Sequence, residues 1–484
     1  MFSTRTVTVL LLVSLLLLFL VTACGASEPQ VVEKVVTKEV EVEKVVEKEV
    51  EVEVVVTATP EAAQAGDGPI LITWWSHFAD QPSKRAMIER LVADYEAEHP
   101  DVDIVLTWWD KNPLRAAIRS TMTAGKGAPD ITTFDTEVIE WVEAGWLLDL
   151  TDALPWENFI PGTELDGTYP DQGYPGVYKF NIGFSVFMLF YNPDIFEELG
   201  IEVPEDRQFT EQEFLDVVQK CNDAGYAGVS DAIGNRPYPG VYPVQYALFN
   251  LVGAEEFQKY ESGKQSWDTP EARKALEYSV QLRDAGLWPD TFTTMTLDET
   301  HAYFHTQHQA CMFYIPSWYT GRAFKAVEEG GQDPNWHFGM LRYPKMDGCQ
   351  ACDTIWVGYE SGYGVLSSTP YPEVSKDILA HFSQPKYGAL WTALTNIPSA
   401  VVYDQEQDWP TPELLDELGF EAGKWDWYWA EFDKAYGSLP TGLAISARCG
   451  DFNDAVVSAL NEGLPLDLVT VDEAVEMLDS NLCQ

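Results

Sequence analysis

Residues 177–196, VYKFNIGFSVFMLFYNPDIF, contain the stretch that decides the fold. Its centre, residues 186–191, is an unbroken apolar run too short for a membrane span or an ordinary helix, which predicts a strand buried on both faces. Asn192, Pro193 and Asp194 then supply a turn and a helix start. Alternating strand and helix patterns lie on both sides, so we interpret this strand as a crossover between two α/β lobes. Gly183 is expected to let the backbone bend there, which makes the space between the lobes the expected site.

The beginning of the chain is typical of an exported lipoprotein. One basic residue, Arg5, precedes an apolar core at residues 7–21, and small residues follow it. The ending Leu-Val-Thr-Ala-Cys at 20–24 resembles the bacterial lipobox, which implies a signal peptide over 1–23 and lipidation of Cys24. Residues 24–68 read as a stalk and linker rich in Val, Glu and Lys, since no other segment of this composition exists to pair with it. We therefore expect a lipid-anchored, extracytoplasmic protein, on the outer face of the membrane or in the periplasm.

Acidic residues dominate the composition, and the formal net charge is −47. After residue 61 the chain carries 67 acidic and 25 basic side chains. Such a body repels nucleic acid and anionic lipid headgroups. It also argues against a strongly anionic ligand, unless a local pocket is basic.

The cysteines predict disulfide bonds. Six cysteines remain after Cys24, and an even number in an exported protein favours disulfides over free thiols. Cys349 and Cys352 flank two residues in a turn rich in Gly and Asp, which predicts a local bridge. The pairing of the other four is left open: Cys221, Cys311, Cys449 and Cys483.

Strand and helix patterns alternate between residues 70 and 135. Strands are expected from Ile70, over 102–106 and over 131–134, with a helix in each interval. This rhythm predicts parallel strands joined by crossovers, and ligands of such sheets gather at the carboxyl ends of the strands. Those ends carry Trp75, His77, Trp109 and Asp135.

The order of several segments resembles family 1 extracellular solute-binding proteins, the maltose-binding-like components of bacterial ABC importers. The resemblance covers nearly everything after the stalk, in the family's order. It is carried by LITWWSHF (71–78), ADYEAEHPDVDIVL (93–106), AGKGAPDITTFD (124–135), EAGWLLDLTD (143–152), LFYNPDIFEELGI (189–201), FTEQEFLDVVQKCNDAG (209–225), DTPEARKALEYSVQLRDAGL (268–287), QACMFYIPSW (309–318) and DAVVSALNEGLPLDLVTVDEAVEMLDS (454–480).

The resemblance implies an α/β, two-lobe periplasmic-binding-protein-like fold of type II, with the lobes joined by a multi-strand hinge. Lobe 1 is then expected at 69–182 and 361–400, and lobe 2 at 186–356 and 404–484. The crossovers are expected near Gly183, near 358–361 and near 400–403. The protein is expected to be monomeric and to contact the permease subunits of an ABC transporter.

Sugars present flat CH faces and a ring of hydroxyls, so a sugar site needs aromatic platforms and short polar groups. Trp75, Trp109 and Trp318 stand where the family places cleft residues, although each could equally pack in the core. Alternation puts only one of Trp74 and Trp75 in the core, and which one is left open. Asp135 could accept bonds from two hydroxyls, or cap the helix that follows.

Further ligand contacts are implied by the resemblance alone. At the second crossover the chain has Tyr359-Glu360 where the family more often has paired glycines, which is a departure from the pattern. The implied contacts are Ser76, His77, Asn181, Phe184, Glu360 and Ser361.

Three histidines, His301, His305 and His308, have a spacing that could place them on one helical face and hold zinc. A turn is expected near residues 306–309, so we interpret them as solvated histidines and predict no metal and no cofactor. The chain has no HExxH, GxSxG, P-loop or GxGxxG pattern, and we predict that it is not an enzyme.

The sequence thus predicts a lipoprotein that captures a neutral sugar or oligosaccharide and delivers it to an ABC permease. Within transport, the alternatives are a sugar phosphate, a polyamine or a metal; a phosphate would need clustered arginines or helix N-terminal amides in the cleft. A surface glycosidase needs only two well-placed carboxylates and is the alternative from another class. A sugar-sensing or adhesion lipoprotein without a permease is a further one.

Overall fold

The computed structural model describes residues 69–484 except 135–137, 237, 438, 445–447 and 484. The predicted signal peptide, the lipidation site Cys24, the stalk and the predicted ligand contact Asp135 therefore lie outside the described residues. Within the described part of the chain, no helix combines the length and the apolar character needed to cross a membrane.

The first of two main sheets has four strands in the order β11-β3-β1-β2. β1 (Ile70–Ser76) is parallel to β2 (Val102–Trp108) and to β3 (Ile131–Phe134), as predicted. β11 (Gly362–Val365) runs antiparallel to β3 and comes from a distant part of the sequence. We call this sheet and the helices packed on it the first lobe. Its helices are α2 (Pro82–Glu98), α3 (Lys111–Ala124), α4 (Val138–Glu143), α12 (Pro372–Phe382), α13 (Pro385–Thr395) and α14 (Pro412–Glu417).

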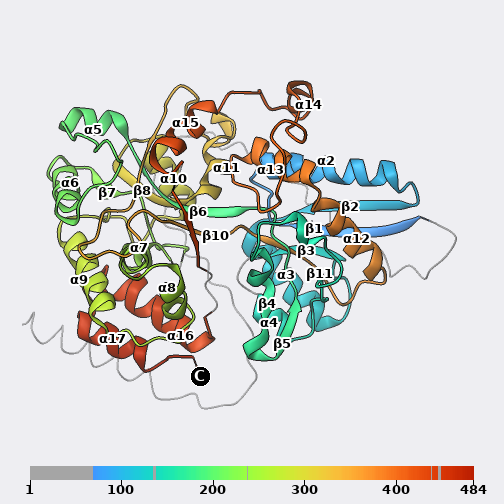
Figure 1. The fold of residues 1–484 in the computed structure, drawn as a ribbon, viewed down its shortest axis with the longest axis horizontal. Coiled ribbons are helices and arrows are strands. Elements are labelled where there is room, and N and C mark those ends of the chain that lie inside the picture. The colour runs from blue at the N-terminus through green and yellow to red at the C-terminus, as the bar shows by residue number, and fades with distance from the viewer. Residues whose placement is uncertain (1–68, 135–137, 237, 438, 445–447, 484) are drawn as a thin grey trace, which may run out of the picture. The chain divides into compact units, whose positions relative to one another are not determined.

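The second main sheet has the order β12-β10-β6-β8-β7, and β9 also pairs with β6. It defines the second lobe, and Figure 1 shows β6 and β10 between β7 and β8 on one side and the first-lobe strands on the other. β7 and β8 are parallel, whereas β6 is antiparallel to its neighbours. The strands are β6 (Phe184–Tyr191), β7 (Ala227–Val229), β8 (Ala310–Pro316), β9 (Gly339–Leu341), β10 (Ile355–Tyr359) and β12 (Thr441–Leu443).

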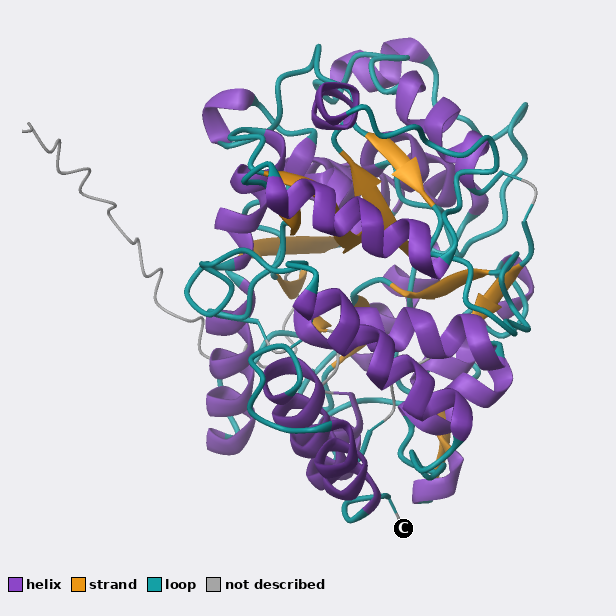
Figure 2. Cartoon of the chain, turned by 90° about the vertical axis from the view of Figure 1, so that its left-hand side faces the viewer, coloured by secondary structure: helices purple, strands orange, loops and turns teal. Residues whose placement is uncertain are grey.

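Helices surround the strands of both sheets (Figure 2). A small hairpin of β4 (Thr168–Tyr169) and β5 (Tyr174–Val177) stands apart from them. The second-lobe helices are α5 (Pro193–Leu199), α6 (Glu211–Asp223), α7 (Tyr242–Val252), α8 (Ala254–Glu261), α9 (Pro270–Asp284), α10 (Leu297–His305), α11 (Thr320–Ala323), α15 (Asp426–Ala435), α16 (Gly450–Val456) and α17 (Val471–Asp479).

β6 is buried on both faces, which confirms the prediction made from its apolar run. Leu189 and Tyr191 belong to one hydrophobic cluster, and Met188 and Phe190 belong to another on the opposite face of the sheet. Successive side chains of a strand point to opposite faces, so the part of β6 that is covered on both sides, residues 186–191, is apolar at every position. The helix start predicted after it is also confirmed, because the Asn192 side chain accepts the amide hydrogens of residues 194 and 195 and caps α5.

The chain passes between the sheets at three neighbouring places. β10 ends at Tyr359 in the second sheet, and β11 begins at Gly362 in the first. The segment before β6 runs beside a third crossing, where the Phe184 amide donates to the Pro398 carbonyl and the Ala400 amide to that of Ile182. These crossings form a multi-strand hinge, while the lobe ranges expected from the sequence stay a prediction.

Gly183 is required for a different reason from the one expected. Its φ is not among the positive values of the chain, so the backbone does not use the left-handed conformation there. A Cβ at this position would lie 2.6 Å from the Trp391 Nε1 atom, which leaves no room for any side chain. The indole of Trp391 on α13 thus packs directly on the crossing backbone.

The described residues contain three disulfides: Cys221–Cys311, Cys349–Cys352 and Cys449–Cys483. The second confirms the predicted local bridge, and the other two resolve the pairing that the sequence left open. Cys221 on α6 and Cys311 on β8 are fully buried in the second-lobe core. This bridge therefore fastens a covering helix to the sheet beneath it.

We expect the Cys221–Cys311 bridge to contribute most to stability because it closes a separation of 90 residues, against 3 for Cys349–Cys352. Replacing both cysteines of the long bridge by Ala should lower the free energy of unfolding by about 4 kcal/mol. The same change at Cys349 and Cys352 serves as the control and should cost about 2 kcal/mol or less. Denaturant unfolding of the oxidised proteins measures both, and equal losses would contradict the assignment.

Candidate functional site

The first candidate surface is the edge where β1, β2 and β3 end, which we call the first rim. Trp74 and Trp75 separate as alternation requires: Trp74 is fully buried, 5.7 Å from the Tyr363 ring. Trp75 lies on the other face, half-buried, with its ring 5.0 Å from that of Trp109 at 44°. The structure therefore identifies Trp75 as the indole outside the main core and pairs it with Trp109, the other predicted platform.

His77 and Ser361, both predicted ligand contacts, lie together at this rim. The His77 Nε2 atom is 3.1 Å from the Ser361 hydroxyl, and Nδ1 is 3.1 Å from the Thr133 hydroxyl. Ser76 is fully buried, and its carbonyl accepts the Trp109 amide hydrogen at 2.8 Å. Ser76 and His77 thus bind neighbouring strands together, and their contact with a ligand stays a prediction.

Glu360 forms a buried ion pair that the sequence did not reveal. Its Oε2 atom is 2.9 Å from Lys84 Nζ, with both side chains 3% exposed or less, and its Oε1 atom accepts the Ser185 hydroxyl at 2.8 Å. The Lys84 ammonium also lies over the rings of Phe78 and Trp391. Both carboxylate oxygens are therefore occupied inside the protein, where they connect α2 to two of the three crossings.

Asn181 and Phe184, also predicted contacts, flank the first crossing. Asn181 is buried and donates through Nδ2 to the Asp166 carboxylate at 2.7 Å, a carboxylate that also pairs with Lys179. Phe184 is half-buried, with its ring 5.3 Å from that of Tyr359 at 31°. Of the two, Phe184 retains the accessible surface that a sugar contact would need.

The second candidate surface, which we call the second rim, lies where β7 and β8 end. Trp318 follows β8 and packs against both the first-lobe core and the second-lobe core, so it stands where the lobes meet. Because β7 is parallel to β8, the residues after β7 reach the same edge. They include Asp231 and Arg236, which were not among the residues predicted from the sequence.

Asp231 and Arg236 are an incompletely satisfied pair. Asp231 is 0% exposed, neither of its oxygens accepts a hydrogen bond from a described residue, and Arg236 Nη1 lies 3.7 Å away. Burial raises the pKa of Asp231 well above its usual value, and Arg236 opposes this only in part. The Arg236 Nη2 atom donates to the Tyr242 hydroxyl at 2.6 Å. Buried polar groups of this kind are unusual in a protein core and common where a ligand completes the bonding.

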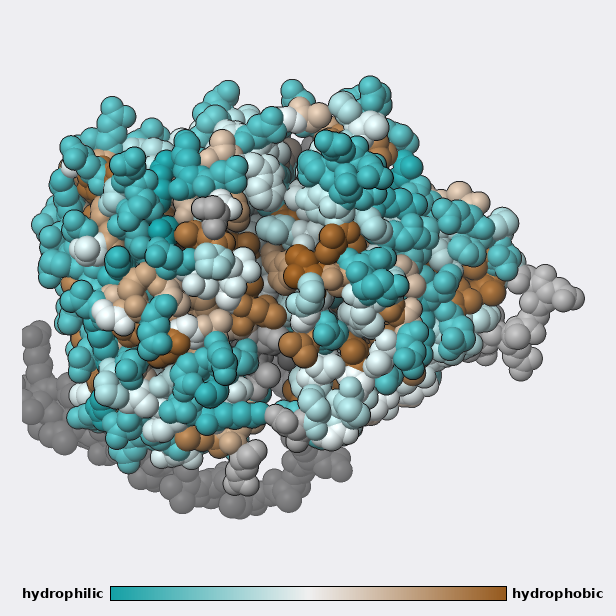
Figure 3. Space-filling view, viewed as in Figure 1, coloured by the Kyte–Doolittle hydropathy of each residue, from teal (hydrophilic) through white to brown (hydrophobic). Residues whose placement is uncertain are grey.

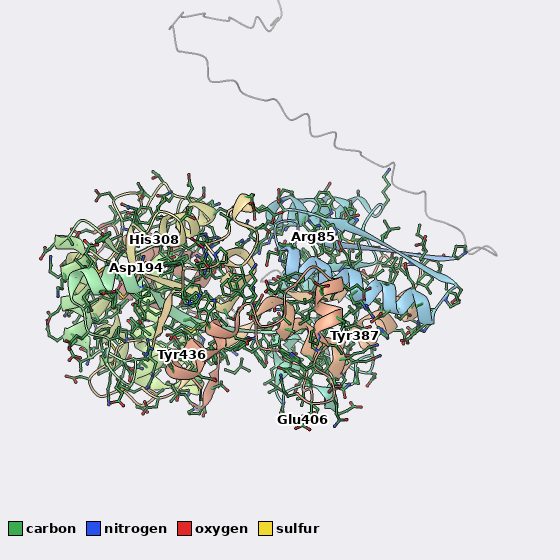
Figure 4. All side chains as sticks on the ribbon, turned by 90° about the horizontal axis from the view of Figure 1, so that it is seen from above. Arg85, Asp194, His308, Tyr387, Glu406 and Tyr436 are labelled. Atoms are coloured by element: carbon green, nitrogen blue, oxygen red, sulfur yellow. A yellow bond between two sulfur atoms is a disulfide. The ribbon has the colours of Figure 1, made fainter. Side chains whose placement is uncertain are left out.

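The two rims touch through Arg322 of α11. Its Nε atom donates to Asp80 Oδ2 at 3.0 Å, and Asp80 follows β1 of the first lobe. Burial raises the pKa of Asp80 and the Arg322 guanidinium lowers it, with a net downward shift. The Thr320 hydroxyl also donates to the Thr395 carbonyl of the first lobe. Figure 4, which labels Arg85 on α2, shows that end of the helix nearer the second lobe.

The histidines differ from the expectation that they are solvated. His301 is 4% and His305 1% exposed, and the His305 Nδ1 atom lies 2.6 Å from the Tyr319 hydroxyl. His308 lies beyond the end of α10, beside Asn192 and, in Figure 4, near Asp194. His301 and His305 are buried because α10 packs its histidine face against β8 and the segment that follows it. Across the described residues, no three His, Cys, Asp or Glu side chains are placed to hold a metal ion.

A weak signal for the second rim was present in the sequence. Residues 224–231, AGYAGVSD, close a helix, form a short apolar strand and end in Asp, as AGKGAPDITTFD does in the first lobe. β7 has only three residues, too few for a periodic pattern to identify. Arg236 and Arg322 come together only through the tertiary fold, so no local sequence pattern identifies them.

Comparison with known proteins gives consistent results. The family model described as bacterial extracellular solute-binding protein matches residues 79–389. An uncharacterized ABC transporter extracellular-binding protein from Pyrococcus horikoshii is 24% identical over 308 residues, which span 60% of this chain and 63% of that relative.

Two solved structures share the fold. One, from work on xylan utilization by a thermophilic Caldanaerobius polysaccharolyticus, has a TM-score of 0.68 at 18% identity and covers 86% of this chain and 100% of its own. The other is a chitin oligosaccharide binding protein, with a TM-score of 0.66 at 18% identity, covering 84% and 97%. Both likenesses show a common fold and no more.

The buried pair of Lys84 and Glu360 gives a test of the hinge. Glu360→Gln leaves the Lys84 charge buried without a counter-charge and should lower the free energy of unfolding by about 3–5 kcal/mol. The double variant with Lys84→Met and Glu360→Gln should lose less free energy of unfolding than the two single variants lose in sum. It leaves no buried charge without its partner. Arg119→Gln, which removes one half of an exposed pair with Glu140, is the control and should cost about 0.5 kcal/mol or less. Additive losses in denaturant unfolding would contradict the pairing.

Proposed function

We propose, from the premise that the chain belongs to the family of bacterial extracellular solute-binding proteins, that it captures a sugar or oligosaccharide between its lobes and delivers it to an ABC permease. The observation that carries this proposal is the pairing of half-buried indoles with unsatisfied polar groups on two facing rims. We propose a binding protein without turnover and a monomer. Membership in this family implies an extracytoplasmic location, and the lipid anchor at Cys24 remains part of the proposal.

The first rim provides the apolar part of a sugar site. Trp75 and Trp109 are half-buried and adjacent, and the Trp109 Nε1 atom has no hydrogen-bond partner among the described residues. An indole binds the CH face of a pyranose ring by dispersion and by contact with its π face, while its N–H can donate to a hydroxyl. This chemistry suits the apolar face of a sugar ring and its hydroxyls.

The second rim provides the polar part. A hydroxyl can accept a hydrogen bond from Arg236 and donate one to Asp231, which would satisfy both groups at once. Together the two rims offer the few convergent polar groups and the aromatic lining that small-molecule sites require. The two proteins of the same fold, one from work on xylan utilization and one that binds chitin oligosaccharides, support the same ligand class.

Closure of the lobes follows because the ligand contacts are divided between the two rims. A ligand that contacts Trp75 on one rim and Trp318 on the other makes all of its interactions only when the lobes are together. The ligand therefore shifts the equilibrium toward the closed form to the extent that it binds that form more tightly than the open form. The backbone of the hinge changes conformation as the lobes move. The permease can then distinguish loaded from empty protein by the relative position of the lobes.

A ligand panel tests the proposal directly. The melting temperature of the full chain is measured with mono- and oligosaccharides, polyamines and sugar phosphates. At roughly a hundredfold excess over the dissociation constant, a true ligand adds ~2.7 kcal/mol to the free energy of unfolding. We expect stabilisation by carbohydrate, with the sugar recovered intact. Cleaved sugar would indicate a glycosidase, and stabilisation by polyamines alone would overturn the ligand class.

The neighbouring tryptophans 74 and 75 provide a matched pair of variants. Trp75→Ala removes a platform at the rim and should weaken sugar binding about tenfold or more by calorimetry, with little change in melting temperature. Trp74→Ala opens a cavity in the first-lobe core and should lower the free energy of unfolding by about 3–5 kcal/mol. If Trp75→Ala destabilises the protein as much as Trp74→Ala does, Trp75 is a core residue and not a platform.

A further inference from the structure

Two arginines flank Trp318 on the second rim. The Arg322 guanidinium carbon is 5.2 Å from the centre of the indole, and that of Arg236 is 5.4 Å from it. The chain beyond residue 61 has only 25 basic side chains against 67 acidic ones, so two cations on one aromatic ring are a local exception to its charge. They belong to different segments, the loop after β7 and helix α11, and the fold brings them together.

Several hydrogen-bond donors in this cluster have no partner among the described residues. Arg236 Nη1 is buried without a hydrogen bond. His301 Nε2, which donates or accepts according to the tautomer of the ring, has no described partner either, and its ring lies 6.1 Å from that of Trp318. Arg322 makes its bond to Asp80 through Nε, and no bond from its two terminal nitrogens to another described residue is found. The cluster thus has more unused donors than a neutral hydroxyl would engage, and it calls for an acceptor-rich group.

The nearby carboxylates offset only part of this charge and leave donors unused. Asp80 pairs with Arg322 through Nε, which leaves the two terminal nitrogens of the guanidinium for a ligand, and Asp298, at 3.8 Å, is 80% exposed, so water screens it. Asp231 lies beside Arg236, and its complete burial raises its pKa well above the usual value, which favours the neutral acid. After burial, the cations Arg322, Arg236 and Lys325 all lower the pKa of His301, as a positive local field requires.

We infer that the captured sugar carries an anionic group, a carboxylate or a phosphate, which Arg236 and Arg322 hold beside Trp318. The inference rests on the proposed function and narrows its ligand class. A planar guanidinium donates two parallel hydrogen bonds to a carboxylate or phosphate, while the neighbouring indole contacts the sugar ring. This ligand class differs from the neutral sugar predicted from the sequence. That prediction used the net charge of the chain, which does not reveal that the fold brings two arginines together at one place.

Matched ligands test the inference on the full chain by calorimetry. Uronic-acid oligosaccharides are compared with neutral oligosaccharides of the same linkage and length, and sugar phosphates with their parent sugars. We expect the anionic member of a pair to bind at least about tenfold more tightly and this preference to shrink as salt is raised from about 50 to about 500 mM. Preference for uronates identifies a carboxylate, and preference for sugar phosphates identifies a phosphate.

Equal binding of the neutral and anionic members overturns the inference and leaves the proposed function standing. No binding of any carbohydrate overturns the proposed function as well, so the two failures are distinguishable.

Arginine variants locate the effect. Arg322→Gln should weaken binding of the anionic sugar about tenfold or more, change binding of its neutral counterpart less than about threefold and reduce the salt dependence. Arg322→Lys keeps the positive charge but loses the planar two-donor geometry of the guanidinium. Its affinity for the anionic sugar should lie between that of the unaltered protein and that of Arg322→Gln. Arg273→Gln removes the same charge from an exposed site paired with Asp268 and Asp472, and should leave both affinities unchanged.

Equal weakening of both ligands by Arg322→Gln would assign Arg322 a structural role and overturn the inference. The melting temperature of each ligand-free variant shows whether it is folded. Should Arg322→Gln fail to fold, Arg322→Lys and the salt dependence of the unaltered protein still decide the question.

Discussion

The buried ion pair of Lys84 and Glu360 is the interaction on which the arrangement of the lobes depends. Two charges removed from water are stable only while each keeps its partner, so their separation is strongly opposed. Lys84 belongs to α2 and Glu360 to a crossing segment, and Ser185 of another crossing binds the same carboxylate. The pair thus holds the first lobe to the hinge at a fixed point, and bending is left to the backbone on either side.

The surface chemistry changes from the outside of the molecule to the rims. Figure 3 shows a predominantly hydrophilic face on which hydrophobic residues gather near the centre. At the rims the indoles of Trp75, Trp109 and Trp318 are half-buried, and unsatisfied polar atoms lie beside them. The acidic exterior keeps the protein soluble and repels other anionic surfaces, while the rims are chemically distinct from it. Net charge therefore describes the exterior and says little about the ligand.

Much of the fold could be predicted because the signals were local. The apolar run of β6, the Asn192 cap and the alternation of strands and helices over 70–135 each depend on neighbouring residues. The first rim followed from parallel strands whose ends share an edge. On the second rim only Trp318 was predicted. The polar groups beside it were not, because Asp231 follows a strand of three residues, and Arg236 and Arg322 meet only in the folded chain. Nothing in the sequence pairs Glu360 with Lys84, 276 positions away, so the ion pair could not be predicted, and a ligand contact of Glu360 stays a prediction.

The pairing of β11 with β3 has a consequence for the order in which the chain assembles. Gly362 pairs with Phe134, so the first-lobe sheet receives its last strand from a segment synthesised after most of the second lobe. Closing so long a loop is entropically unfavourable and slow. A growing chain that has emerged only as far as β10 holds three of the four strands of this sheet, with one side of β3 unpaired. The strand pairings of β6 with β8 and with β10 in the second sheet involve only segments that emerge before β11, so they can form before the first-lobe sheet is completed.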